Sequence, residues 1–277
     1  MYREKRTVLP AFRIRTARLR MLPAFVILSV ERGGTTSLYR YLCQHPWVAE
    51  AFRKEVHYFD MNAGRGLAWY RAHFPTRLEA LWVRLRRGHP LLTGEASPYY
   101  LYHPHVPARL ARALPDARLI ALVRNPVERA YSHHQMNVRQ GKEDLGFAEA
   151  TLREEERLRG EWERLVADES YFSERHYRYG YLARGRYAER LEEWSKVFPR
   201  ERLRVVASED LYADPAGTLA DVSAYLGLPP WTPAGFKAYN QKPYPGLDPT
   251  TRRRLAEHFE PHNQRLYAWL GRDLGWS

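Results

Sequence analysis

A turn of glycine and hydroxyl residues follows the first apolar run of the chain. The turn reads SVERGGTTSL (29–38) and separates the β-rich run Val26–Val30 from a helical pattern over residues 36–44. At such a strand-to-helix turn, backbone N–H groups and the helix dipole bind anions such as phosphate. The expected anion ligands are Gly33, Gly34, Thr35, Thr36 and Ser37. An ordinary turn with a threonine cap uses the same residue types, so the pattern needs independent support.

The turn departs from the P-loop of nucleotide-binding proteins. That loop, G-x-x-x-x-G-K-[ST], has a lysine directly before the hydroxyl residue, whereas this chain has Gly34 there and Arg32 two residues earlier. An ATP-dependent kinase also needs an aspartate that holds magnesium, and the strand ends offer no clear candidate. A P-loop-type kinase is therefore an alternative that metal-independent turnover would exclude.

A second cluster that could bind phosphate is LVRNPVERAYSHHQM (122–136). Arg124 directly follows the apolar run Ala117–Val123, and Ser132 lies eight residues later, about two helical turns on if a helix begins near Asn125. Arginine binds phosphate through two parallel hydrogen bonds. Two phosphate sites together predict a bisphosphorylated nucleotide.

The elements that must position these residues alternate along the chain. Besides the two runs already named, short apolar runs at Leu203–Ser208 and Leu91–Gly94 are typical of buried strands. Helical patterns lie between the runs, for example over residues 126–140 and 185–198. Alternating strands and helices predict βαβ units around a parallel sheet, with ligands at the carboxyl ends of the strands.

Composition sets the class of partner. The 277 residues include 44 lysines and arginines against 32 acidic residues, and only six of the 44 are lysine. A formal net charge of +12 favours an anionic partner: nucleic acid, a nucleotide, an acidic polysaccharide or a membrane surface. No nucleic-acid-binding module is recognisable. An inactive protein that binds an acidic polymer through its arginines is a further alternative.

The chain is expected to form a single domain at residues 23–277, after a basic leader at 1–22 that is poorly ordered or docked at the periphery. The single cysteine, Cys43, permits no intramolecular disulfide. No stretch approaches the roughly 20 apolar residues of a membrane span. These features predict a cytoplasmic protein without a signal peptide or a membrane span.

The sequence resembles the sulfotransferases that use 3′-phosphoadenosine 5′-phosphosulfate (PAPS), in particular bacterial and heparan-sulfate-type carbohydrate sulfotransferases. The resemblance runs from about Phe25 to the end of the chain, and the ordered occurrence of its motifs is specific. The matching motifs are ERGGTTSLYRYLCQHP (31–46), KEVHYFD (54–60), GEASPYYL (94–101), VRNPVERAYSHH (123–134), RGRYAERLEEWSKVFP (184–199) and EDLYADPAGTLADVSAYLGLP (209–229).

This resemblance implies a P-loop-kinase-like α/β fold in three layers, with a central parallel β-sheet flanked by helices. It implies transfer of a sulfuryl group from PAPS to a hydroxyl or amine, with adenosine 3′,5′-bisphosphate (PAP) as the product and no metal. Arg32 takes the place of the family's usual loop lysine and would contact the 5′-phosphosulfate. Arg124 and Ser132 would bind the 3′-phosphate. Lys242 matches a basic nucleotide contact loosely.

The resemblance places the catalytic base at Glu55, within a Glu-x-His-x-x-Asp pattern that also contains His57 and Asp60. An acceptor hydroxyl is a poor nucleophile until a positioned base takes its proton. Two other roles are open: Glu55 could only pair with Lys54 or Arg53, and His57 could orient a neighbour rather than touch substrate.

The acceptor is expected to be a carbohydrate or glycoconjugate. Ala96 stands where several heparan-type enzymes have a lysine, which leaves the identity of the acceptor open. The aromatic run YYLYH (99–103) could stack on a sugar ring or form a packed cluster. His133 and His134 have no partners at metal-ligand spacing, so they predict no metal site.

Overall fold

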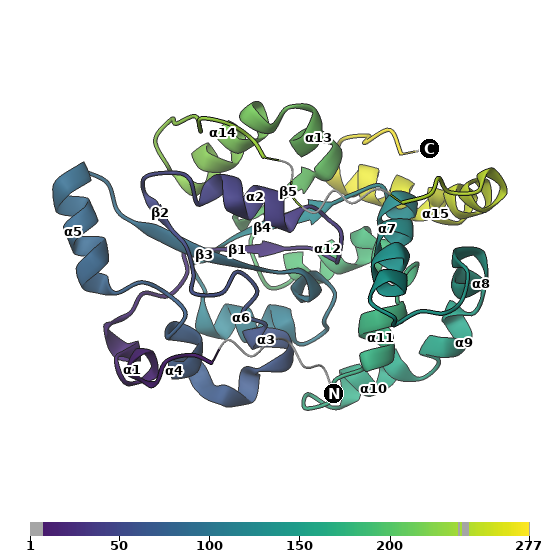
Figure 1. The fold of residues 1–277 in the computed structure, drawn as a ribbon, viewed down its shortest axis with the longest axis horizontal. Helices are drawn as coiled ribbons and strands as arrows, with labels where there is room; N and C mark the ends of the chain where they lie inside the picture. Colours follow the sequence, from purple (N-terminus) through teal and green to yellow (C-terminus); the bar gives the residue numbers. More distant parts are fainter. Residues whose placement is uncertain (1–7, 238, 240–243, 277) are drawn as a thin grey trace.

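The protein is described from a computed structural model, which covers residues 8–237, 239 and 244–276. Within these residues, five parallel strands form one sheet in the order β2-β3-β1-β4-β5 (Figure 1). Their bounds are β1 Phe25–Leu28, β2 Val48–Ala49, β3 Leu92–Ser97, β4 Arg118–Val123 and β5 Leu203–Ala207. The predicted α/β fold with a central parallel sheet is confirmed. The edge strand β2 was not predicted, because two residues are too few to carry a periodic signal.

Side chains of β1 alternate between two separate cores, as a strand buried on both faces requires. Phe25 and Ile27 pack with Leu38 of α2 (Thr35–Leu42) and Leu219 of α14 (Pro215–Leu226). Val26 and Leu28 pack on the opposite face with residues of α6 (Val106–Ala113) and α12 (Tyr187–Ser195). The sheet is thus the middle of three layers.

Further helices surround this centre. They are α3 Tyr58–Met61, α4 Gly66–Arg71, α7 Pro126–Arg139, α8 Phe147–Leu152, α9 Glu154–Leu158, α10 Glu161–Ala167, α11 Glu174–Tyr179, α13 Ser208–Ala213 and α15 Pro249–Leu270. Helix α7 begins where Asn125 Oδ1 accepts hydrogen bonds from the N–H groups of Val127 and Glu128, with Pro126 at the first position. This cap fixes the start of the helix that carries Ser132.

The central strands β1 and β4 bring the two predicted phosphate sites together. They pair in parallel with Leu28 opposite Ala121, so their carboxyl ends lie at the same edge of the sheet. Ser29, the first residue after β1, donates a hydrogen bond to Leu122 O at 2.9 Å. The glycine turn and Arg124 therefore begin side by side.

Residues 8–22 are docked on the body of the protein. They include α1 (Ala11–Arg15) and a short 3-10 turn (Ala17–Leu19). Arg13 Nε donates to Ala72 O at 2.7 Å, and Arg20 Nη1 donates to Phe74 O at 2.9 Å. No helix within the described ranges is long and apolar enough to span a lipid bilayer.

Candidate active site

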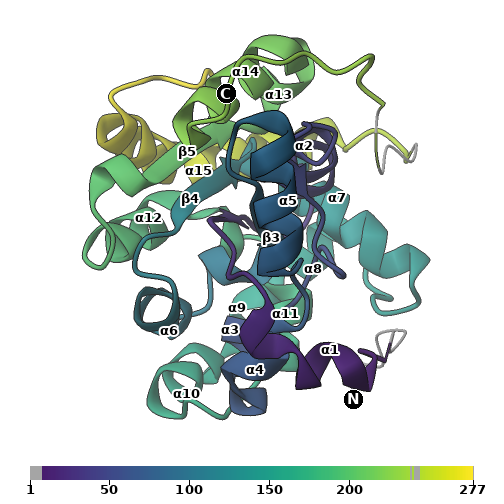
Figure 2. The ribbon, with the colours of Figure 1, turned by 90° about the vertical axis from the view of Figure 1, so that its left-hand side faces the viewer.

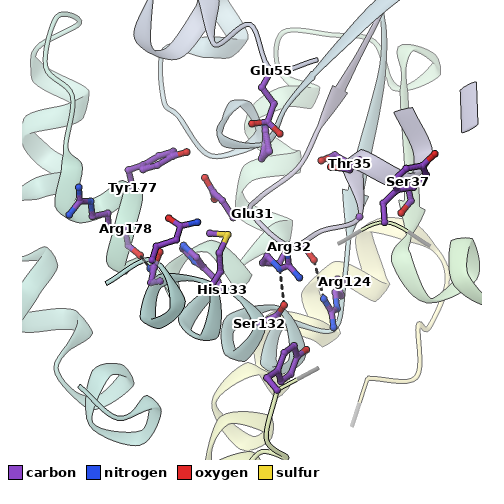
Figure 3. A pocket seen from close by; sticks show the side chains of 18 of the residues that line it. Glu31, Arg32, Thr35, Ser37, Glu55, Arg124, Ser132, His133, Tyr177 and Arg178 are labelled. Carbon is purple, nitrogen blue, oxygen red and sulfur yellow. Dashed lines mark hydrogen bonds between the residues drawn. The ribbon is translucent and has the colours of Figure 1, made fainter. Parts of the chain in front are cut away.

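A cavity of about 640 Å³ opens at the carboxyl ends of β1 and β4 (Figure 3). Its volume lies within the range that ligand pockets usually have. Eight of the residues that the sequence singled out line it: Arg32, Gly34, Thr35, Thr36, Ser37, Glu55, Arg124 and Ser132. Lys242, the other predicted nucleotide contact, lies outside the described residues. The two predicted phosphate sites and the predicted base thus share one cavity.

The glycine turn owes its shape to Gly33 and Gly34. Gly34 has φ +89°, and a Cβ there would lie 3.2 Å from Tyr212 Oη, so a side chain would be both strained and crowded. The N–H of Gly33 donates to Val30 O at 3.1 Å, and Ser208 Oγ donates to Gly33 O at 2.7 Å.

These bonds involve two of the expected anion ligands. The N–H groups of Gly33 and Ser37 donate to Val30 O and Gly34 O, so both amides are hydrogen-bonded within the turn. The N–H groups of Thr35 and Thr36 stand in the first turn of α2, where a helix offers no internal acceptor. An anion would therefore meet the start of α2, while Gly33 serves the turn itself.

Two arginines converge at the lower part of the cavity in Figure 3. Arg32 Nε donates to Ser132 Oγ at 2.9 Å, and Arg124 Nη1 donates to Arg32 O at 3.1 Å. Burial and the nearby charges of Arg124 and Arg139 lower the pKa of Arg32. Like charges held together in this way are stabilised by a bound anion, and arginine remains charged throughout.

Lys54 joins the turn to the predicted base. Its Nζ lies 2.9 Å from Thr36 Oγ1 and 2.6 Å from Glu55 Oε1. The sequence analysis treated Lys54 only as a possible partner of Glu55 and missed its contact with the turn. The position of Lys54 directly before Glu55 in KEVHYFD was the one sequence feature that could have indicated a role at the site.

Strand β3 holds the segment that carries Lys54 and Glu55. The N–H of Ala96 donates to Lys54 O at 2.9 Å. The N–H of Val56 donates to Glu95 Oε2 at 3.2 Å, and the N–H of His57 donates to Ser97 Oγ at 3.0 Å. The GEASP motif therefore positions the segment around the predicted base by hydrogen bonds from its backbone and from the side chains of Glu95 and Ser97.

His57 is enclosed between two carboxylates. Its Nδ1 lies 2.7 Å from Asp60 Oδ2, and its Nε2 lies 3.9 Å from Glu55 Oε2. The residue is 3% exposed and is not part of the cavity wall. This geometry favours the alternative in which His57 orients Glu55 rather than touching substrate.

The charges of this group set its protonation. Burial alone would lower the pKa of His57, but the Asp60 and Glu55 carboxylates outweigh it and raise the pKa well above the usual 6.5. Burial would raise the pKa of Glu55, whereas its interactions with His57 and Lys54 outweigh that effect and lower the pKa to about 2. Glu55 is thus ionised and able to accept a proton at neutral pH.

The raised pKa of His57 makes the stability of the protein depend on pH. Because the folded state binds this proton more tightly, the stabilisation is complete below about pH 6.5 and is lost as pH rises through the folded-state pKa. We expect the difference in unfolding free energy between the wild type and His57→Gln to shrink as pH rises. Urea unfolding of both proteins across neutral and alkaline pH measures it, and a difference that stays constant would refute the assignment.

Glu31 also lines the cavity, and its role was not predicted from the sequence. Figure 3 shows Glu31 between Glu55 and Arg32. One carboxylate oxygen of Glu31 accepts a hydrogen bond from Arg184, which is fully buried and also donates to Tyr177 O. The other, Oε1, is buried and has no partner among the described residues. No sequence pattern links Glu31 to Arg184, because 153 residues separate them.

The aromatic run 99–103 is packed rather than available for stacking on a sugar. Tyr99, Tyr100 and Tyr102 are buried in the core below the sheet. His133 lines the cavity, and burial together with the nearby Arg184 lowers its pKa well below the usual value. Within the described part of the chain, no group of three or more histidine, cysteine or acidic side chains could hold a metal ion.

Comparisons with known proteins show the family of this chain. The family model described as "Sulfotransferase domain" matches residues 22–234. Mouse heparan sulfate glucosamine 3-O-sulfotransferase 3A1 is 30% identical over 93% of this chain, which spans about 65% of that relative's length. A crystal structure of a sulfotransferase from Alicyclobacillus acidocaldarius is similar with a TM-score of 0.67 and 31% identity, covering 92% of this chain and 98% of that one. The chain belongs to the sulfotransferase domain family.

Proposed function

We propose that this protein transfers the sulfuryl group of PAPS to a hydroxyl or amine of a carbohydrate or glycoconjugate acceptor and releases PAP. One observation carries the proposal: the anion-binding turn, the paired Arg32 and Arg124, and the carboxylate of Glu55 face a single cavity. The turn and the two arginines suit a bisphosphorylated donor, and the carboxylate of Glu55 suits activation of an acceptor. The site thus has separate parts for donor and acceptor.

On the donor side, the start of α2 and Arg32 would hold the 5′-phosphosulfate. Arg124 and Ser132 would hold the 3′-phosphate. Arg124 directly follows β4 and Ser132 lies on α7, as the sequence predicted. Arg32 would stabilise the negative charge that builds on the bridging oxygen as the S–O bond breaks. As a permanent cation, it stabilises that charge without donating a proton.

On the acceptor side, Glu55 would take the proton of the attacking hydroxyl. The new bond joins the acceptor oxygen to sulfur, the bond from sulfur to the phosphate oxygen breaks, and PAP carries away the electron pair. Lys54, within reach of both Thr36 and Glu55, can move toward the phosphosulfate when the donor binds. Loss of that contact would weaken the stabilisation of ionised Glu55 and make it a stronger base.

The acceptor class is supported by the mouse relative, whose name gives glucosamine of heparan sulfate as its acceptor. In this cavity Lys142 and Arg178 supply positive charge. A cytoplasmic location is also part of the proposal, supported by the single cysteine.

Incubation of the protein with radiolabelled PAPS and a panel of acceptors tests this proposal. The panel should contain sulfated and unsulfated glycosaminoglycans, neutral oligosaccharides, tyrosyl peptides and lipid alcohols. We expect label on a carbohydrate without added metal. Transfer to a peptide or a lipid instead would support sulfotransferase activity but refute the carbohydrate acceptor. Label on no acceptor, together with an absence of PAP binding, would refute the proposed sulfotransferase activity.

A further inference from the structure

Helix α5 (Arg77–Arg87) exposes an apolar stripe at the surface. Leu78, Leu81, Trp82 and Leu85 follow the i, i+3, i+4, i+7 spacing and are 73%, 51%, 54% and 77% exposed. In a helix packed on a protein core, this spacing marks the buried side. In α5 only Val83 is buried, so the apolar side of the helix faces away from the body.

Arginines border the stripe. Arg77, Arg84, Arg86 and Arg87 are all exposed, and Glu79 is the one acidic residue of α5. The guanidinium of Arg86 lies 5.3 Å from the centre of the Trp82 ring. Long arginine side chains can lie along an apolar surface and extend their charged ends to its edge. The helix thus combines an apolar strip with a positively charged border.

The N-terminal segment exposes apolar and basic side chains as well. Phe12, Ile14 and Leu19 are 59%, 40% and 59% exposed, and the neighbouring Arg15 and Arg18 are exposed as well. A backbone hydrogen bond from Met21 N to Pro75 O, 2.9 Å long, ties this segment to the residues before α5. Figures 1 and 2 place α1 and α5 on the same side of the molecule. We call the exposed side chains of α1, residues 18–19 and α5 the apolar-basic face.

The chemistry of this face selects one occupant. A second copy of the chain, related by a two-fold axis, would bring two arginine-rich surfaces with little acidic charge together. An acidic polysaccharide or nucleic acid would neutralise the arginines but leave the leucines and Trp82 in water. An anionic lipid surface satisfies both groups, because its phosphates lie above an apolar layer.

We propose that the apolar-basic face docks the protein on an anionic membrane surface, with α5 lying in the plane of the interface. Trp82 is suited to the headgroup level, where the aromatic rings of membrane proteins gather. Helices α7 and α11, which border the cavity, lie in the half of the molecule away from α5 (Figure 1). Docking through α5 therefore leaves the cavity open to solvent, and the inference does not depend on the reaction catalysed there.

Sedimentation of the full chain with lipid vesicles tests this proposal. One set of vesicles contains phosphatidylcholine alone, and the other contains equal parts of phosphatidylcholine and phosphatidylserine. The test variant replaces Leu78, Leu81 and Leu85 with serine, and the matched control is Leu152→Ser, which changes a 68% exposed leucine of α8. These positions are exposed, so both variants should keep the fold, which circular dichroism and thermal unfolding verify.

We expect the wild type and Leu152→Ser to bind the phosphatidylserine vesicles and the triple variant to bind them at least tenfold more weakly. Equal binding by the triple variant would show non-specific adsorption of a basic protein and overturn the proposal. Absence of wild-type binding would overturn it too. A concentration-dependent dimer that the triple variant abolishes, without vesicle binding, would assign the face to a second copy instead.

Discussion

Glu55→Gln is expected to lower kcat by about a hundredfold or more, the usual contribution of a general base, while PAP binds with nearly unchanged affinity. Glutamine keeps the size of the side chain but cannot take the proton of the acceptor. PAP affinity should persist because the donor contacts come from Arg32, Arg124 and the start of α2. Steady-state kinetics and a PAP titration on the same preparation give the two numbers.

Glu50→Gln is the matched control for this experiment. Glu50 pairs with Arg40 on the surface, outside the cavity, so its replacement should leave kcat unchanged. Full turnover in Glu55→Gln would remove Glu55 from the role of base. An equal loss of turnover and PAP affinity would mean instead that Glu55 supports the donor site through Lys54.

Arg124→Ala should weaken PAP by about tenfold to a hundredfold, because a hydrogen bond to a charged group contributes about 1.5–3 kcal/mol. Adenosine 5′-phosphate, which lacks the 3′-phosphate, should lose much less affinity. The two nucleotides should differ because the guanidinium of Arg124 would contact only the 3′-phosphate. Calorimetric titration of both nucleotides against the wild type and the variant measures it.

Arg202→Ala provides a control of the same chemistry, since Arg202 pairs with Asp116 on the surface far from the cavity wall. It should leave both affinities unchanged. If Arg124→Ala weakened the two nucleotides equally, Arg124 would not contact the 3′-phosphate. Its bond to Arg32 O would then be its main role, as a support of the turn.

Local sequence patterns were sufficient to predict that the glycine turn and Arg124 lie close together, where they line one cavity. The glycine turn and Arg124 each directly follow a buried strand, and parallel pairing of β1 and β4 brings such positions together. The detailed use of the turn was not predictable, because the role of the Gly33 amide depends on the carbonyl of Val30. The backbone angles of the turn decide which acceptor the Gly33 amide bonds to, and the residue types alone do not indicate it.

The acceptor half was less predictable, because its contacts join residues distant in sequence. The Glu31–Arg184 pair spans 153 residues, and the support of His57 by Ser97 joins the residue before α3 to the last residue of β3. The aromatic run 99–103 was ambiguous for the same reason. Tyrosines suit both a core and a sugar-binding surface, and only burial distinguishes the two uses.

The apolar stripe of α5 shows the converse limit. Its spacing predicts a helix, yet the same spacing would ordinarily predict that the stripe is buried. Only the three-dimensional arrangement shows that Leu78, Leu81 and Leu85 face outward. Sequence periodicity identifies the apolar side of a helix but not what that side contacts.

The most direct test of the central claim is a calorimetric titration of the wild-type protein with PAP, beside adenosine 5′-phosphate, ADP and ATP, each with and without magnesium. We expect PAP to bind without metal and more tightly than any nucleotide that lacks the 3′-phosphate. Binding of ATP that requires magnesium, without binding of PAP, would refute the proposed function and assign the cavity to a phosphoryl-transfer enzyme.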